Sequence, residues 1–319
     1  MRIFVTDDYP ALVDVYNASW HRYPTTLAQL QTQDQAARRH PASRFQRYVV
    51  ERQGHIVAFG QYDQPPRFYE PGRFRASIFV HPQYQRQGIG TRLYQRLIEE
   101  LGELNTFTLW ARIREDMPGG VQFASKQNFY EELRVWELRL AVANFDVTPY
   151  ATLNNMLDAQ GIEIKTLKEL ESDPERYQKL YDITKEAGQD LPPTEHWALP
   201  SYDDFKRDTL VRTAEAYFVA LKENNYIGLS YLTEYRQEHY CGIGFTGVRR
   251  AYRRQGIALA LKLHGIAYAR QHAYTSIRTT LDSANRASFA MNERLGFVKQ
   301  PAWIVFAKEF TPRYSSQPA

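Results

Sequence analysis

Two short segments of this 319-residue chain combine glycine with a helix start in a way that suits a bound anion. In the second segment, an apolar run from Ile243 to Val248 leads through a basic turn into Arg253-x-x-Gly256-x-Ala258. Amides in the first turn of a helix lack partners within the helix, and the helix dipole favours negative charge there. Gly256 lets the backbone approach a ligand closely, because glycine has no Cβ. The segment therefore predicts a phosphate cradle between a strand and a helix.

The same pattern occurs once more, upstream. Phe79 and Val80 end an apolar run, and Gln85-x-x-Gly88-x-Gly90 follows, 168 positions before the second copy. A repeat at that interval predicts two domains in tandem, each large enough to bury its own core. We expect residues 1–145 to form the first domain and residues 146–319 the second.

The spacing Arg/Gln-x-x-Gly-x-Gly/Ala resembles motif A of the GNAT superfamily, the acyl-CoA-dependent N-acetyltransferases, in which these amides hold the CoA pyrophosphate. The resemblance implies an α/β (α+β) protein of two GNAT-like domains, each a mixed, mostly antiparallel sheet flanked by helices, with acetyl-CoA as cosubstrate. The positions that match the CoA-binding segments are Thr246, Gly247, Val248, Arg253, Arg254, Gln255, Gly256, Ile257, Ala258 and Asn285 in the second half, and Phe79, Val80, Gln85, Arg86, Gln87, Gly88, Ile89 and Gly90 in the first.

A second motif distinguishes the two halves. Asn285, followed by a helical stretch that closes at Leu295-Gly296-Phe297, resembles motif B of GNAT proteins. In the first half this motif is degraded, with Pro118-Gly119-Gly120 in place of the asparagine and Gln127-Asn128-Phe129 in place of Leu-Gly-Phe. This combination resembles tandem GNAT proteins of the mycothiol synthase type. We expect the second domain to be catalytic, and the first either to bind CoA without turnover or to shape the acceptor cleft.

Acyl transfer to an amine also needs a binding edge for pantetheine and a polarised thioester carbonyl. In GNAT proteins the strand before the cradle separates from its neighbour at a bulge, and its free backbone groups bind pantetheine like an added strand. Thr246 to Val248 match that strand, and Gly244 or Gly247 would suit the bulge. A backbone amide of the same strand would polarise the carbonyl.

The amine must lose its proton before it attacks, and a carboxylate, directly or through water, is the usual base. Glu234 is the first candidate for the base and Glu238 the second; the alternative is that both are solvated loop carboxylates. Many GNAT proteins place a tyrosine on the closing helix to protonate the leaving thiolate. That position holds Asn292 here, and Ala124 in the first half. Either water supplies the proton, or Asn292 hydrogen-bonds the pantetheine or the sulfur.

Composition limits the other functions. The formal net charge of +4 is too mild to indicate nucleic-acid binding, although arginines crowd residues 249–254 and would attract an anionic cofactor. One cysteine, Cys241, allows no disulfide within the chain, and no Cys/His cluster has metal-ligand spacing, so we expect no metal. The sequence starts without a signal-peptide pattern and has no membrane-length apolar run, which predicts a cytoplasmic protein without a membrane partner.

The predicted function is an acetyl-CoA-dependent N-acyltransferase that acts on a small-molecule amine by direct transfer in a ternary complex, with the oligomeric state left open. A closed pocket walled by Trp197, Tyr202 and the loop Pro192-Pro193 would favour a small amine. An open groove would favour a protein lysine or N-terminus instead. A further alternative is a CoA-binding sensor or scaffold without turnover, which the missing tyrosine motivates.

Overall fold

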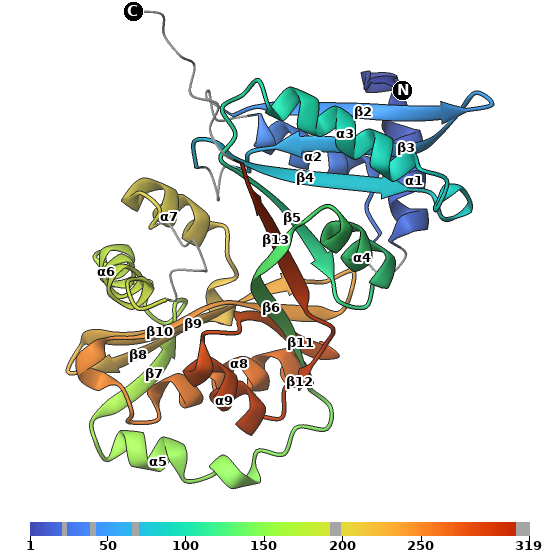
Figure 1. The fold of residues 1–319 in the computed structure, drawn as a ribbon. Coiled ribbons are helices and arrows are strands. Elements are labelled where there is room, and N and C mark those ends of the chain that lie inside the picture. The colour runs from blue at the N-terminus through green and yellow to red at the C-terminus, as the bar shows by residue number, and fades with distance from the viewer. Residues whose placement is uncertain (21–23, 39–42, 66–69, 192–198, 311–319) are drawn as a thin grey trace, which may run out of the picture. The chain divides into compact units, whose positions relative to one another are not determined.

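The computed structural model describes residues 1–20, 24–38, 43–65, 70–191 and 199–310 (Figure 1). The chain divides into two compact units. Unit 1 comprises Met1–Glu132 and Ile304–Ala319, and unit 2 comprises Leu133–Trp303. Each unit combines helices with a mixed sheet, as the sequence predicts. None of the helices in the described ranges is long and apolar enough to cross a membrane.

Unit 1 orders its strands β1-β2-β3-β4-β5-β13. Strands β1 to β4 pair antiparallel with their neighbours, whereas β4 and β5 run parallel. The strands are β1 (Arg2–Ile3), β2 (Phe45–Arg52), β3 (His55–Asp63), β4 (Arg73–Val80), β5 (Thr108–Arg114) and β13 (Trp303–Glu309). The helices are α1 (Tyr9–Ser19), α2 (Leu27–Ala37), α3 (Ile89–Leu101) and α4 (Pro118–Lys126).

This sheet has an apolar layer on each face. Successive side chains of a strand point to opposite faces, so one strand contributes to both layers. On β3, Ala58 packs in a cluster with Leu93 and Leu97 of α3, whose four-residue spacing gives that helix one apolar face. The next residue, Phe59, packs in a different cluster with Leu12 of α1. The cradle helix α3 therefore covers one face of the sheet, and α1 covers the other.

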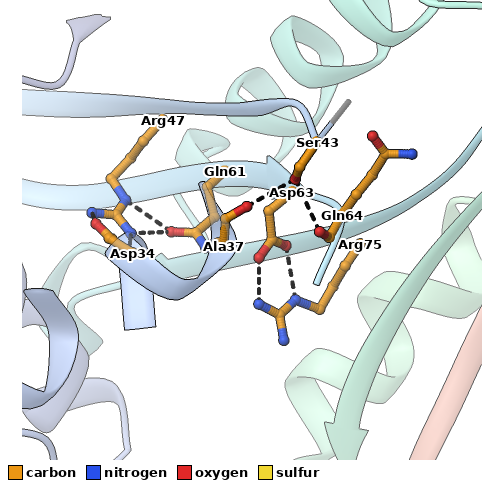
Figure 2. Close-up of polar contacts among 8 residues, drawn as sticks. All are labelled: Asp34, Ala37, Ser43, Arg47, Gln61, Asp63, Gln64 and Arg75. Atoms are coloured by element: carbon orange, nitrogen blue, oxygen red, sulfur yellow. Dashed lines mark hydrogen bonds and ion pairs between the residues drawn. The ribbon is translucent and has the colours of Figure 1, made fainter. Parts of the chain in front are cut away.

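The face that α1 and α2 cover also contains a buried ionic network, shown in Figure 2. Arg47 of β2 is 2% exposed and donates from both terminal nitrogens to Asp34 of α2, at 2.7 and 2.8 Å. Gln61 Oε1 on β3 accepts two more hydrogen bonds from the same guanidinium, and Tyr9 OH donates to Asp34. The network ties α1 and α2 to the sheet and satisfies both buried charges.

Unit 2 orders its strands β6-β11-β10-β9-β8-β7, and β12 pairs with β6. The strands are β6 (Tyr130–Ala141), β7 (Ile162–Thr166), β8 (Tyr217–Lys222), β9 (Asn225–Tyr235), β10 (Tyr240–Val248), β11 (Ser276–Asp282) and β12 (Val298–Lys299). The helices are α5 (Leu153–Asp158), α6 (Arg176–Gly188), α7 (Tyr202–Leu210), α8 (Ile257–Gln271) and α9 (Arg286–Arg294). Of these strand pairs, β10 and β11 run parallel.

The compact units do not follow chain order alone. Strand β6 precedes residue 145 in the sequence, yet it pairs antiparallel with β11 of unit 2 from Val135 to Ala141. Strand β13 comes near the end of the chain and lies beside β5 of unit 1. Each unit is therefore completed by a strand from the other half of the sequence. The expected domain boundary at residue 145 stays a prediction.

Candidate functional site

The two predicted cradles adopt the same backbone conformation. Both follow a short 3-10 turn after a strand, and both alternate left-handed residues. In unit 1 these residues are Arg86 (φ +62°) and Gly88 (φ +77°); in unit 2 they are Arg254 (φ +63°) and Gly256 (φ +85°). Gly88 and Gly256 cap α3 and α8. A left-handed residue at these positions turns successive amides to the same side.

Each cradle presents a row of backbone N–H groups that suits a phosphate. Among the described residues, the amides of 86–91 in unit 1 and 254–259 in unit 2 have no hydrogen-bond acceptor. A Cβ added to Gly88 would meet nothing within 4 Å, whereas a Cβ on Gly256 would lie 2.8 Å from Leu153 Cδ1. The amides therefore fit a CoA pyrophosphate, and the second cradle has Leu153 of α5 against one side.

Side chains brace both turns from equivalent positions. Arg253 Nε donates to the carbonyl of Val248, the last residue of β10, at 3.0 Å. Gln85 Nε2 makes the same hydrogen bond to Val80 at the end of β4, also at 3.0 Å. This shared contact fixes the turn to the strand, which explains why either residue type serves at the first motif position. Contact of these two side chains with a cofactor remains a prediction.

Carboxylates compensate most of the basic turn in unit 2. Glu186 of α6 and Asp190, which follows the end of α6, form ion pairs with three arginines. The pairs are Arg249–Glu186 at 3.0 Å, Arg250–Asp190 at 2.7 Å and Arg253–Asp190 at 2.7 Å. Arg250 and Arg253 hold the pKa of Asp190 well below its usual range. Arg254 makes no ion pair in the described part of the chain, and neither does its counterpart Arg86, so these two arginines are left to attract an anion.

Strand β10 leaves its parallel neighbour soon after the pairing begins. Its pairs with β11 run only from Tyr240 to Gly242, whereas its antiparallel pairs with β9 continue to Val248. We call residues 243–248, on the side that faces away from β9, the free edge. The β9–β10 register shifts between Ile243 and Phe245, which places a bulge at Gly244, one of the two glycines expected there.

Of the two strands that lead into the cradles, β10 has a bulge and β4 does not. Strand β4 also leaves β5 after three pairs, at Arg75, but its register with β3 is regular. A Cβ on Gly244 would lie 1.9 Å from the Tyr231 ring, so glycine is needed there. Thr246 on the free edge shares a 2.8 Å hydrogen bond with Ser230 of β9, which occupies its hydroxyl. Binding of pantetheine by the backbone of residues 246–248 stays a prediction.

A groove of about 660 Å³ lies next to the start of the free edge. Leu232 and Thr233 in its wall pair with Ile243 and Gly242, where β10 leaves β11. Arg212 donates to Thr233 Oγ1 at 3.3 Å. The lining residues are Asp208, Val211, Arg212, Thr213, Leu232, Thr233, Glu234, Tyr235, Arg236, Gln237 and Glu238. A groove of this size has room for a small molecule, and it combines carboxylates with cations.

Glu234, the first candidate for the base, is held by four donors. Its side chain is 7% exposed and accepts from Thr213 (2.6 Å), Tyr268 (2.9 Å), Tyr274 (2.7 Å) and Arg236 (3.0 Å). Burial raises the pKa of Glu234, but these hydrogen bonds outweigh burial and lower the pKa to about 2. A carboxylate this well satisfied is a weak base, so the geometry does not favour Glu234 in that role.

Glu238, the second candidate, lies in the same groove. It is exposed on the β9–β10 hairpin and makes no ion pair among the described residues. The expected wall of Trp197 and Pro192-Pro193 lies outside the described residues, and Tyr202 begins α7. An exposed carboxylate in the groove is able to take a proton from a bound ammonium through water.

Asn292 of α9 does not face solvent. It is 0% exposed, donates from Nδ2 to the Ser288 carbonyl at 2.8 Å, and accepts from Lys262 Nζ of α8 at 3.1 Å. Asn285 caps the start of α9 by accepting from the Ser288 amide. Sequence reasoning missed Lys262, although one signal was present: a single lysine interrupts the apolar run Ile257–Leu263 at the start of a buried helix.

Comparisons with known proteins agree with this geometry. The sequence profile of the acetyltransferase (GNAT) family matches residues 9–129 and 177–297, two segments that begin 168 positions apart, like the two cradles. Mycothiol acetyltransferase of Thermobispora bispora is 22% identical over 237 residues, which cover 72% of this chain and 75% of that protein.

Two solved structures share the fold over nearly the whole chain. A GCN5-related N-acetyltransferase from Sphaerobacter thermophilus has a TM-score of 0.69 at 16% identity, with 98% of this chain and 95% of that chain covered. A tandem GNAT protein from the clavulanic acid biosynthesis pathway has a TM-score of 0.68 at 18% identity, with 96% of each chain covered.

Proposed function

Since the chain belongs to the acetyltransferase (GNAT) family and is an N-acetyltransferase, we propose that it transfers an acetyl group from acetyl-CoA to a primary amine of a small molecule, directly within a ternary complex. The observation that carries the proposal is the continuity of one strand. The free edge of β10 connects the unpaired amides of 254–259 at one end to the groove at the other. The small-molecule acceptor is supported by the size of the groove and by the relative named mycothiol acetyltransferase.

We place turnover in the second half of the sequence. Both units have a cradle and a strand that leaves its parallel neighbour, but the bulge at Gly244 and the adjacent groove belong to unit 2. A bulge turns backbone groups away from the ladder, which leaves an amide free to donate to a thioester carbonyl. The first half is then a cofactor-binding domain or a structural one.

Each step of the reaction has a group to serve it. The amides of 254–259 and Arg254 hold the pyrophosphate, and the free edge pairs with the pantetheine amides. An amide at the bulge polarises the thioester carbonyl. Glu238 takes the ammonium proton through water, after which the amine attacks within the same complex and no acyl-enzyme forms.

Initial-rate kinetics across a panel of primary amines test the proposal. We expect CoA release with at least one small amine, intersecting double-reciprocal plots, and a loss of rate in Glu238→Gln with acetyl-CoA binding retained. Exposed Glu223 on the β8–β9 turn gives a matched control, Glu223→Gln, which should leave the rate unchanged. Parallel plots would point to an acyl-enzyme, and acetyl-CoA binding without release across the panel would favour a sensor.

A further inference from the structure

Lys262 is a buried cation without a carboxylate. The residue is 5% exposed, and its only hydrogen bond in the described part of the chain goes to Asn292 Oδ1. An amide oxygen satisfies one of the three ammonium N–H groups and carries no compensating charge. An unpaired buried charge is expensive, and groups of this kind concentrate at functional sites.

Among the described residues of α8 and α9, no carboxylate pairs with Lys262. On α8, His264 packs on the Phe218 ring and Tyr268 donates to Glu234. On α9, Glu293 pairs with Lys299. Burial alone lowers the pKa of Lys262, to about 8, so the ammonium is the main form at neutral pH. In the part of the chain that the structure describes, this ammonium therefore has no carboxylate partner.

Contacts along α8 place Lys262 level with the free edge. A Cβ on Gly228 would lie 3.3 Å from Leu261, and Gly228 pairs with Val248 at one end of that edge. A Cβ on Gly265 would lie 3.6 Å from Leu232, which pairs with Ile243 at the other end. Lys262 falls between these two contacts along the helix. Successive side chains of a helix point about 100° apart, so Lys262 points away from the face that carries Leu261. Its hydrogen bond to Asn292 shows that it points toward α9.

In the proposed reaction the thioester lies along the free edge, so acyl transfer would create a negative charge at this level. When the amine nitrogen bonds to the thioester carbon, the carbon–sulfur bond breaks and its electron pair stays on sulfur. A thiol has a pKa of about 8.5, so a thiolate released into an apolar site needs a cation or a proton. The two arginines of the groove are already engaged, since Arg236 pairs with Glu234 and Arg212 lies over the Tyr231 ring. Arginine also stays protonated in proteins, so neither residue supplies a proton.

We propose that Lys262 is a catalytic residue that donates a proton from Nζ to the CoA sulfur as the carbon–sulfur bond breaks, with Asn292 Oδ1 holding the ammonium in place. The sulfur leaves as a thiol. The nitrogen loses two protons in the reaction: the groove carboxylate takes the first through water and releases it to solvent, and the second, lost after attack, passes through water to the neutral lysine and restores its ammonium. This assignment rests on the proposed function and adds the acid that the reaction requires.

The test measures the thiol of bound CoA, so it needs no acceptor. CoA is added to Gly88→Glu protein, which limits binding to the second cradle, with and without Lys262→Met. The ultraviolet absorbance of the thiolate is then followed against pH. An ammonium beside the sulfur should keep the pKa of the bound thiol at least about one unit below its value in Lys262→Met. Lys299→Met removes the same charge at an exposed position near α9 and should leave this pKa unchanged.

Turnover provides the second measurement. With the best amine of the panel, Lys262→Met should lower kcat by about 100-fold and leave KM for acetyl-CoA nearly unchanged, because general-acid catalysis contributes on that scale. The loss of rate should come without loss of stability, since the variant removes an uncompensated buried charge. A fall in kcat that tracks a fall in melting temperature would mean a structural role.

The outcomes separate this proposal from the one on which it rests. If CoA does not bind to the second cradle, both fail. If CoA binds and its thiol has the same pKa in the parent and in Lys262→Met, the assignment of Lys262 alone is wrong. Acetylation of Lys262 itself by acetyl-CoA, detected in a peptide mass map, would also overturn it, because that result needs a neutral nucleophile.

Discussion

At the scale of single residues, Glu234 shows how a plausible base becomes a structural anchor. Its carboxylate collects donors from four places in the sequence: Thr213, Arg236, Tyr268 and Tyr274. Each hydrogen bond stabilises the ionised form, so the pKa falls to about 2 although burial acts in the opposite direction. The carboxylate therefore joins β9 to α8 and to the segments before β8 and after α8.

The depressed pKa predicts how stability depends on pH. Glu234→Gln should lower the free energy of unfolding at pH 7 by on the order of 2 kcal/mol, because the folded state favours the carboxylate. The contribution is complete above the unfolded pKa of about 4.3 and is lost as pH falls through the folded pKa of about 2. Urea unfolding at pH 7 and pH 3 measures this contribution. The difference in the free energy of unfolding between wild type and Glu234→Gln should be smaller at pH 3 than at pH 7. The control Glu238→Gln, at an exposed position, should have the same free energy of unfolding as wild type at both pH values.

A second prediction at this scale concerns the buried ion pair of Arg47. Arg47→Met removes the guanidinium and leaves the buried Asp34 carboxylate with Tyr9 as its remaining donor. Removing one partner of a buried ion pair lowers stability by about 3–5 kcal/mol, so the melting temperature should fall strongly. The double variant Arg47→Met/Asp34→Leu should recover much of it, because neither charge is then buried alone. Equal losses in the single and double variants would show that packing, not charge, sets the cost.

At the scale of elements, the two cradle turns differ in what surrounds them. Both offer six unpaired amides, but the turn in unit 1 is open on the side of Gly88, and Leu153 of α5 contacts Gly256 in unit 2. Ion pairs also compensate three of the arginines of the second turn. Leu153 must shift for a ligand to reach Gly256 from that side. Ligand binding should therefore be weaker at the second turn.

Native mass spectrometry with acetyl-CoA tests this difference. We expect wild type to bind two equivalents of acetyl-CoA at saturation, and Gly88→Glu and Gly256→Glu to bind one equivalent each. The reason is that a glutamate side chain brings bulk and like charge to a phosphate site. The site lost in Gly88→Glu should be the one that binds acetyl-CoA with the higher affinity. A non-glycine residue in the left-handed region costs about 1–2 kcal/mol, so the control is Gly54→Glu on the β2–β3 turn, at φ +78° with nothing within 4 Å. Two equivalents in every variant would contradict both cradles.

Local chemistry explains which elements could be predicted from the sequence. The turns at Gly88 and Gly256 were predictable because a left-handed residue next to a helix start demands glycine. A bulge in this strand was expected from the family resemblance, which left Gly244 and Gly247 open. The choice of Gly244 was not predictable, because the Tyr231 ring that leaves no room for a Cβ approaches it only in the fold. The role of Glu234 was not predictable, because its donors lie between residues 213 and 274 and meet only in the fold.

At the scale of the whole molecule, the pairing of the last strands departs from the tandem order of the sequence. The alternation in β6 and the apolar run in β13 favour strands, but neither pattern specifies which strand is the partner. Strand β6 gives Leu138 and Leu140, 0% and 4% exposed, to the core of unit 2. Strand β13 gives Ile304 and Phe306 to a cluster with Ala124 of unit 1.

This exchange predicts which fragments of the chain fold. A fragment of residues 146–319 follows the sequence repeat but lacks β6, so the edge of β11 that pairs with Val135–Ala141 is left open. An unpaired edge next to an exposed core promotes aggregation. A fragment of residues 130–303 contains β6 and all the other strands of unit 2. Expressed side by side, the 130–303 fragment should be monodisperse in gel filtration and unfold cooperatively on heating, and the 146–319 fragment should aggregate. Cooperative unfolding of the 146–319 fragment alone would show that β6 is dispensable and that the sequence repeat is the folding unit.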